Sequence, residues 1–367
     1  MIEWGRASMM MPKERLERIM HGEPVDRPAC ICPGGMMNMV TAELMDACKV
    51  YLPEAHTDAR MMADLAKAVY EYGCFENVGV PFCMTVEAEA MGAQVDMGSN
   101  IFEPRVTGYV MNSASEYGTL SVPDLTQGRE AVVLEAIRYL KQDLDGVPVV
   151  GNLTGPISTA SSLMEPMVFY RELRKKNADA HAFLQFVTDQ LIAFGKAQIK
   201  AGADVIAISD PSGTGEILGP KYFEEFAVKY LNQLIDAFRE EGVGTIVHIC
   251  GQMQPVYKQV AEIRSHVLSF DSMVPMQEAK ANLSGRTLMG NVSTYALEFG
   301  DPEKVASLAR YCMEHGSSIL SPACGLGMKS PLVNVQAMLK AASAYIPEEV
   351  SSTPEDGEDV SEHLEET

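Results

Sequence analysis

Short apolar runs alternate with longer amphipathic stretches through the second half of the chain. The apolar runs predict strands at 147–153, 203–209, 244–250, 267–270, 287–290 and 317–321. Between them, apolar positions recur three and four residues apart, which is the spacing of a helix with one buried face. Strands that alternate with helices in this way predict a parallel sheet covered by helices.

The first half is less regular. An amphipathic helix at 13–20 is followed by a Gly- and Pro-rich break at 21–28 and a short strand at 29–32. Across the whole chain, further predictions are helices at 41–50, 57–72, 81–92, 128–144, 220–241 and 253–264, an extended segment at 74–78 and a hairpin strand at 106–111.

For the fold, a doubly wound sheet is one interpretation, but no G-x-G-x-x-G follows a strand. We therefore expect a (β/α)8 TIM barrel with an N-terminal helical extension, as one domain over 1–346.

Composition narrows the class of protein. The chain has 367 residues, of which 47% are hydrophobic, and its formal net charge is −21. Such an acidic chain would repel nucleic acid and anionic membranes, so neither is expected as a partner. Residues 347–367 hold acidic residues and no Lys or Arg, which predicts a disordered, solvating tail. With eight cysteines, no secretory pattern and no long apolar run, we expect a cytoplasmic protein with reduced thiols.

The ends of the predicted strands carry the candidate chemistry, because barrel enzymes act at that face. His248 and Cys250 lie two residues apart and would project from one strand face. Cys324, in Ser-Pro-Ala-Cys-Gly, is the candidate third ligand. One imidazole and two thiolates are typical of a catalytic zinc site with an open position. Core packing is the alternative for each cysteine.

Other polar residues stand at the same ends. Asp210 and Asp271 would bind substrate, orient His248 through its second nitrogen, or cap helices. We expect Asn152 and Asn291 to contact a cofactor. Away from these ends, Glu87 and Glu89 are expected on a solvated helix face, and His56 on the surface or at a cap. The remaining cysteines are expected in the core.

Several segments together resemble the uroporphyrinogen decarboxylase superfamily. They are Pro-Lys-Glu-Arg-Leu at 12–16, Pro-Val-Asp-Arg-Pro at 24–28, Glu-Ala-Glu-Ala-Met-Gly at 87–92, Gly-Asn-Leu-Thr-Gly-Pro at 151–156, Ala-Gly-Ala-Asp at 201–204, Gly-Asn-Val at 290–292 and Ser-Pro-Ala-Cys-Gly at 321–325. His-Ile-Cys-Gly at 248–251 is similar to the His-x-Cys motif of its zinc methyltransferases, which include methylcobamide:coenzyme M methyltransferase.

The resemblance implies a function. Zn²⁺ held by His248, Cys250 and Cys324 would activate a thiol such as coenzyme M, and the thiol would take a methyl group from a methylated corrinoid protein. Three alternatives stay open: a first-step methyltransferase that moves methyl from an ether, amine or methanol-type donor to a corrinoid protein, a uroporphyrinogen decarboxylase, and a non-catalytic zinc- or corrinoid-binding barrel. The decarboxylases use an Arg-rich segment after the first strand, whereas residues 29–37 hold no arginine here.

Overall fold

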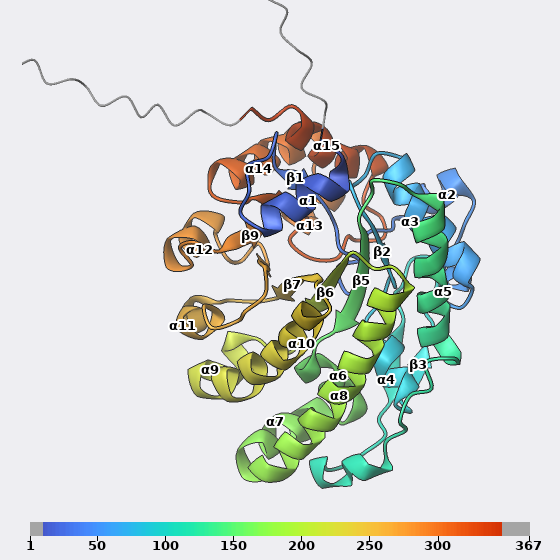
Figure 1. Cartoon of the computed structure of the whole chain (residues 1–367), viewed down its shortest axis with the longest axis vertical. Helices are drawn as coiled ribbons and strands as arrows, with labels where there is room; N and C mark the ends of the chain where they lie inside the picture. Colours follow the sequence, from blue (N-terminus) through green and yellow to red (C-terminus); the bar gives the residue numbers. More distant parts are fainter. Residues whose placement is uncertain (1–9, 347–367) are drawn as a thin grey trace, which may run out of the picture.

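Eight parallel strands form the inner wall of the molecule, and helices surround it (Figure 1). The structure is a computed structural model, and it describes residues 10–346. The strands are β1 (Ala29–Cys30), β2 (Val78–Val80), β5 (Val149–Thr154), β6 (Val205–Ser209), β7 (Gly244–Ile249), β8 (Val267–Phe270), β9 (Thr287–Met289) and β10 (Ile319–Leu320). Their order in the sheet is β1-β10-β9-β8-β7-β6-β5-β2, and each neighbouring pair is parallel. This confirms the predicted α/β barrel.

The two ends of this sheet, β1 and β2, are joined by polar contacts in place of a regular ladder. The backbone N–H of Glu76 donates to the carbonyl of Cys30 at 2.9 Å. The Asn77 side chain accepts from the N–H of Cys32 at 3.0 Å and donates to its carbonyl at 2.8 Å. Asn77 is fully buried, so these bonds also satisfy backbone groups that water cannot reach. The barrel is closed here by the Glu76 backbone and the Asn77 side chain.

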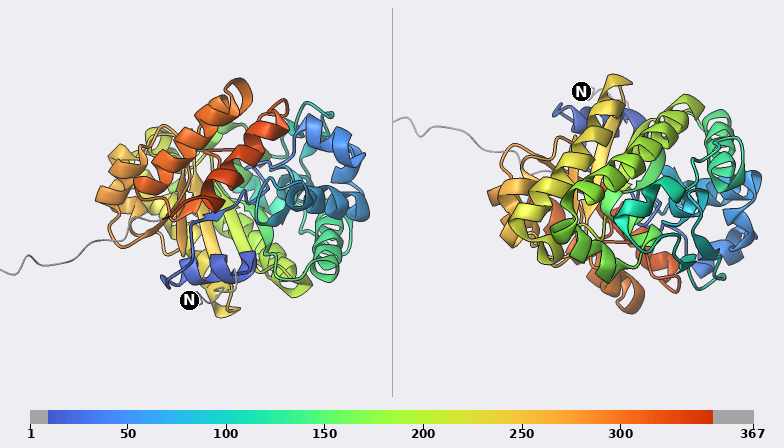
Figure 2. Two further views of the ribbon diagram at one scale, coloured as in Figure 1. Left: turned by 90° about the horizontal axis from the view of Figure 1, so that it is seen from above. Right: turned by 90° about the horizontal axis from the view of Figure 1, so that it is seen from below.

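Long helices cover the outside of the wall. They are α3 (Ala59–Glu71), α5 (Gly128–Asp143), α8 (Asn177–Ala201), α10 (Lys229–Glu240), α14 (Pro302–Glu314) and α15 (Leu332–Ser343). Shorter helices are α1 (Pro12–Met20), α2 (Ala42–Cys48), α4 (Val86–Ala90), α6 (Pro156–Leu163), α7 (Pro166–Lys175), α9 (Gly215–Tyr222), α11 (Tyr257–Val260), α12 (Met276–Asn282) and α13 (Thr294–Phe299). Figure 2 shows α14 and α15 side by side on one flank. No helix among residues 10–346 is long and apolar enough to cross a membrane.

The predicted N-terminal helix, α1, lies across the amino ends of the central strands. Its Lys13 Nζ donates to Asp204 Oδ1 at 2.7 Å, just before β6, and Met20 packs against Gly244 at the start of β7. Arg15 is buried and bonds Asp26 at 2.7 Å and Glu76 at 2.8 Å. A buried arginine needs such partners, because an unpaired charge there would be costly. One end of the barrel is therefore covered, and the carboxyl ends of the strands remain for the site.

Some predicted elements are placed differently. The extended segment predicted at 74–78 is β2, at Val78–Val80. The predicted hairpin strand pairs as β4 (Arg105–Gly108) with β3 (Gln94–Asp96). The helix predicted at 253–264 is wrong in extent: a 3-10 turn at Gln254–Val256 leads into the four-residue α11. Pro255 cannot donate a backbone hydrogen bond, so α-helical bonding starts only after it. The predicted tail at 347–367 lies outside the described residues.

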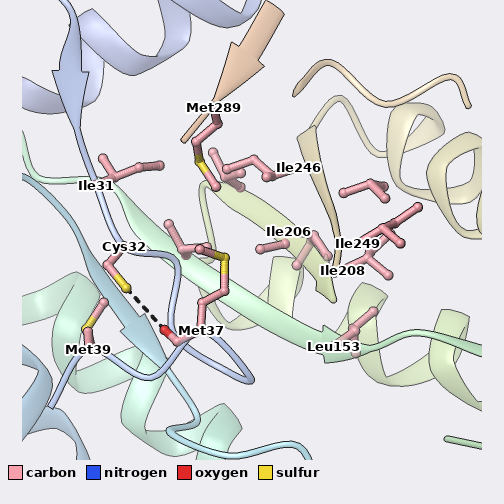
Figure 3. Close-up of a cluster of buried hydrophobic side chains, with 14 of the residues drawn as sticks. Ile31, Cys32, Met37, Met39, Leu153, Ile206, Ile208, Ile246, Ile249 and Met289 are labelled. Carbon is pink, nitrogen blue, oxygen red and sulfur yellow. Dashed lines mark hydrogen bonds between the residues drawn. The ribbon is translucent and has the colours of Figure 1, made fainter. Parts of the chain in front are cut away.

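The interior of the barrel is filled by side chains from the strands and from one loop (Figure 3). Every residue of β5 and β6 is buried, as expected for strands covered on both faces. The strand side chains Ile206, Ile246 and Met289 approach Met37, which comes from the loop after β1. The barrel is therefore a packed core, and chemistry is confined to its mouth.

Candidate metal centre

Three side chains with metal-binding atoms meet at the mouth of the barrel. His248 is the fifth residue of β7, Cys250 follows that strand directly, and Cys324 lies on the loop after β10. Nε2 of His248 is 3.3 Å from Sγ of Cys250, which is 3.8 Å from Sγ of Cys324. All three ligand atoms lie within 4.8 Å of one another. The structure thus brings together the three residues that the sequence singled out.

The orientation of His248 follows from the register of the sheet. His248 pairs with Ser209 on β6 and with Ser269 on β8. Ser269 Oγ lies 2.8 Å from Nδ1 of His248, and His248 is only 1% exposed. Nδ1 is therefore hydrogen-bonded to Ser269, and Nε2 faces the cysteines. The prediction that Asp210 or Asp271 orients His248 is wrong, because Ser269 occupies that place.

The loops that carry the two cysteines are fixed by close backbone packing. Gly251 has φ +79°, a left-handed conformation that turns the chain directly after Cys250. A Cβ on Gly325 would lie 2.6 Å from the carbonyl oxygen of Met36, so only glycine fits beside Cys324. The N–H of Ala323 donates to the Val292 carbonyl at 2.8 Å. The Cys324 loop is thus held against both the β1 loop and the end of β9.

The two thiols are electrostatically coupled. The Cys250 thiol donates to the sulfur of Cys324, which lowers the pKa of Cys324, and the nearby His248 imidazole lowers it further. The same hydrogen bond and burial raise the pKa of Cys250, because its ionisation would place a second thiolate beside the first. The charge of Asp271 adds to this increase. The pair holds one proton that a cation would displace.

This donor set fits a soft divalent metal. Metal binding needs deprotonated sulfur, so a metal would displace the proton that the two thiols share. One imidazole and two thiolates at the mouth of a barrel are the ligands of catalytic zinc sites. The structure gathers the three ligand atoms within bonding reach of a single ion.

The other predicted site residues are engaged elsewhere. Asp210 is fully buried, and its carboxylate accepts from the N–H of Ile157 at 3.2 Å and the N–H of Ser158 at 2.8 Å, which caps α6. Burial raises the pKa of Asp210 to about 6. Asp271 accepts from the Met273 N–H at 3.0 Å. Of the three roles considered for Asp210, helix capping is the one its hydrogen bonds support, and substrate contact stays a prediction.

The two asparagines bind backbone carbonyls. Asn152 Nδ2 donates to the carbonyl of Pro33 at 2.8 Å, and Asn291 Nδ2 donates to that of Val274 at 2.7 Å. Asn152 Oδ1 is buried without a partner in the described part of the chain. Both residues thus hold loops at the mouth, and contact with a cofactor stays a prediction.

Two expectations outside the metal centre are corrected. Glu87 is only 2% exposed, and its oxygens accept from the N–H of Thr154 at 2.7 Å and from its hydroxyl at 3.0 Å. His56 is 1% exposed, so it is neither a surface nor an exposed capping residue. Sequence reasoning missed Ser269. It expected the Met-rich segment 34–40 at the barrel mouth only as an apolar contact for the corrinoid partner, whereas the sulfur of Met36 lies 3.6 Å from Cys324 Sγ. Only the sheet register could have revealed Ser269.

Known proteins similar to this chain support one family. Residues 11–345 match the family described as "Uroporphyrinogen decarboxylase (URO-D)". The chain is 34% identical to "Methylcobamide:CoM methyltransferase MtbA" of Methanosarcina acetivorans, over 91% of this chain and 98% of that protein. It is 30% identical to "Methylated-thiol--coenzyme M methyltransferase" of Methanosarcina mazei, over 91% of this chain and 89% of that protein.

A solved structure agrees with this result. The "methyltransferase from Methanosarcina mazei" superposes with a TM-score of 0.85 at 33% identity, over 91% of this chain and 98% of that one. The match thus spans the whole barrel, including the strand ends that carry His248, Cys250 and Cys324. The chain belongs to the uroporphyrinogen decarboxylase (URO-D) family.

Proposed function

We propose that this chain is a zinc-dependent methyltransferase that moves a methyl group from a methylated corrinoid protein to a thiol such as coenzyme M. The observation that carries the proposal is the meeting of His248, Cys250 and Cys324 at the barrel mouth. It occurs in a chain that matches methylcobamide:CoM methyltransferases over nearly their full length.

The chain's own residues prepare the site. Ser269 holds Nδ1 of His248 and leaves Nε2 for the metal, and the Cys250–Cys324 pair has one proton to release. A zinc ion held there would lower the pKa of an acceptor thiol and keep it as a thiolate. In the transfer, the acceptor sulfur bonds to the methyl carbon, the cobalt–carbon bond breaks, and its electron pair stays on cobalt. The thiol proton leaves to solvent.

The corrinoid protein would dock on the mouth of the barrel. Support comes from large apolar side chains that are exposed on the connections following β2, β5, β6, β8 and β9: Phe102, Met167, Ile217, Met273, Tyr295 and Phe299. We call these the rim residues. Exposed apolar groups that gather around a functional face are typical of a surface that binds another macromolecule. Asp271, whose charge acts on Cys250, is our candidate for a substrate contact beneath this surface.

The decarboxylase alternative gains no support from the arginines near β1. Arg27, the nearest, is paired with Glu76, whose carboxylate also accepts from the N–H of Cys30 at 2.9 Å. This arginine therefore stabilises β1, and it is not free to bind a substrate carboxylate.

Loss of one sulfur ligand tests the proposed function. We expect the purified chain to contain zinc and to consume methylcobalamin in the presence of coenzyme M, followed by absorbance. Cys324→Ser should lose the metal, and its activity should fall more than about 100-fold. Removal of a side chain that only hydrogen-bonds a metal ligand typically costs about 10- to 100-fold, so loss of a ligand itself should cost more. Cys48→Ser, on α2 and outside the cluster, is the matched control and should keep both.

Other outcomes would point to the alternatives. A chain without zinc would contradict the proposal and reopen decarboxylation. If every thiol failed while methanol, an amine or an ether donated methyl to the corrinoid protein, the first-step reaction would replace it. A zinc-loaded chain inert with all donors and acceptors would indicate a binding barrel.

A further inference from the structure

The loop after β1 brings a thioether to the metal centre. This loop carries Met36, Met37 and Met39, of which Met37 and Met39 are buried in the core (Figure 3). Met36 is only partly buried, and its Sδ lies 3.6 Å from Sγ of Cys324. Met36 also packs against the core, but unlike the other two methionines its sulfur faces Cys324.

The loop holds Met36 there through its backbone. Its carbonyl oxygen lies against Gly325, where a Cβ would approach it to 2.6 Å. Two residues on, the Asn38 carbonyl accepts from the N–H of Leu326 at 2.8 Å. The β1 loop and the Cys324 loop thus form one packed unit, so the approach of the two sulfurs is built into the backbone.

The spacing of the sulfurs matches metal ligation. A tetrahedral zinc site with bonds of about 2.3 Å places neighbouring sulfur ligands about 3.8 Å apart. The Cys250–Cys324 separation is 3.8 Å and the Cys324–Met36 separation is 3.6 Å. In the structure the Cys324 thiol donates to the Met36 sulfur, so the two sulfurs face each other directly. A cation between these two lone-pair donors would satisfy both.

Glu103 is an acidic group near this place, because burial and the Cys324 charge raise its pKa to about 7, but its carboxylate is not among the gathered ligand atoms of the described residues. Among residues 10–346, the His, Cys, Asp and Glu donors gathered within 4.8 Å of one another are His248, Cys250 and Cys324 alone. The Asp271 carboxylate lies outside that group and accepts from Met273 N–H. From the β1 loop, Met36 is the residue whose sulfur contacts Cys324.

We propose that Met36 Sδ is an exchangeable fourth ligand that holds the acceptor position until a thiol displaces it. The inference rests on the proposed function. A thioether is a neutral, weak donor, so an anionic thiolate displaces it readily. The Met36 side chain also ends in CH3–S–CH2, the group that methyl transfer to a thiol creates. A pocket that accommodates Met36 therefore accommodates the methylated product.

Zinc-edge X-ray absorption of the selenomethionine-labelled, full-length chain tests the contact. In the wild type we expect a selenium neighbour in the first shell of zinc, which disappears when coenzyme M is added. Met36→Leu should retain zinc and show no selenium neighbour. Met61→Leu, a similarly half-buried methionine on α3, is the matched control and should resemble the wild type. Zinc without a selenium neighbour in the wild type would overturn the inference and leave the proposed function standing, whereas absence of zinc would contradict the proposed function itself.

Thiol binding gives a second readout. A ligand that must be displaced reduces the apparent affinity of the incoming thiol, because only the fraction of sites that is open binds it. Calorimetric titration with coenzyme M should therefore show a Kd for Met36→Leu that is lower by roughly two- to tenfold, with Met61→Leu unchanged. A Kd that is equal or higher in Met36→Leu would contradict displacement.

Discussion

At the scale of single residues, His248 depends on a neighbour in the sheet. Its Nδ1 lies 2.8 Å from Ser269 Oγ, and this contact leaves Nε2 for a metal. The serine is itself fully buried, so the imidazole has no water to bind in its place. Fixing a ring nitrogen in this way sets the tautomer and the direction of the ligand.

We predict that Ser269→Ala weakens metal binding and leaves the fold intact. Loss of the partner of a metal-binding histidine typically costs 10- to 100-fold in affinity, and we expect a loss in this range here. Competition with a zinc-binding dye would measure it. Ser284→Ala, which removes an exposed serine hydroxyl, is the control. Equal zinc affinity in Ser269→Ala and the wild type would show that the hydrogen bond does not hold the ligand.

At the scale of elements, short irregular segments make contacts that the regular strands of the barrel do not make themselves. Asn77 joins β1 to β2, and the β1 loop supplies Met37 to the barrel interior. The 3-10 turn Glu54–His56 packs between α3 and Phe82, which follows β2. In that turn both ring nitrogens of His56 lack a partner among the described residues. Such a turn makes folding stability sensitive to pH.

We predict an acid-linked loss of stability from His56. Burial, with the nearby Arg129 charge, lowers its pKa to about 3 from 6.5. Between these values the unfolded chain binds a proton that the folded chain does not, so stability falls as pH drops below 6.5. Between pH 7.5 and 5 this amounts to about 2 kcal/mol.

Urea unfolding at the two pH values would measure this contribution. His56→Leu should lose less stability on acidification than the wild type, by about that amount. His315→Gln, which removes a histidine from the surface, should behave as the wild type. An identical acid loss in His56→Leu would mean that His56 is not the source.

At the scale of the whole molecule, the two ends of the barrel have different roles. α1 covers the amino ends of β6 and β7, while the candidate metal centre lies at the carboxyl ends and the rim residues lie on the connections that follow the strands. A protein-bound corrinoid must approach this mouth closely enough for methyl transfer, whereas free methylcobalamin can enter without a protein–protein contact. Comparing the rates with these two methyl donors therefore separates the effect of a rim residue on protein docking from its effect on methyl transfer.

We predict that Phe102→Ala lowers kcat/KM with the corrinoid protein by roughly tenfold, as removal of a large aromatic contact does. Phe102 is 67% exposed, so the fold should tolerate the change. The rate with free methylcobalamin should stay as in the wild type. Tyr311→Ala, an exposed aromatic on α14 away from the rim, should alter neither rate. Equal losses with both methyl donors would mean that Phe102 serves the site itself and not docking.

The sequence by itself predicted the barrel and the three residues of the candidate metal centre. Alternating strands and helices specify a parallel sheet, and the two-residue spacing of His248 and Cys250 places both near one strand end. Cys324 could be added because the carboxyl ends of parallel strands meet at one face. These features are local, or follow from a general rule of the fold, so residue order alone predicts them.

Tertiary structure alone decided the partners of these residues. Ser269 reaches His248 through the register of β7 and β8, and Met36 reaches Cys324 across a sequence separation of 288 residues. Glu87 carries a charge that suggests a solvated face, yet its carboxylate is buried against Thr154. Such contacts depend on strand register and loop packing, which are set by the burial of the whole core and leave no periodic signal near the residues they join.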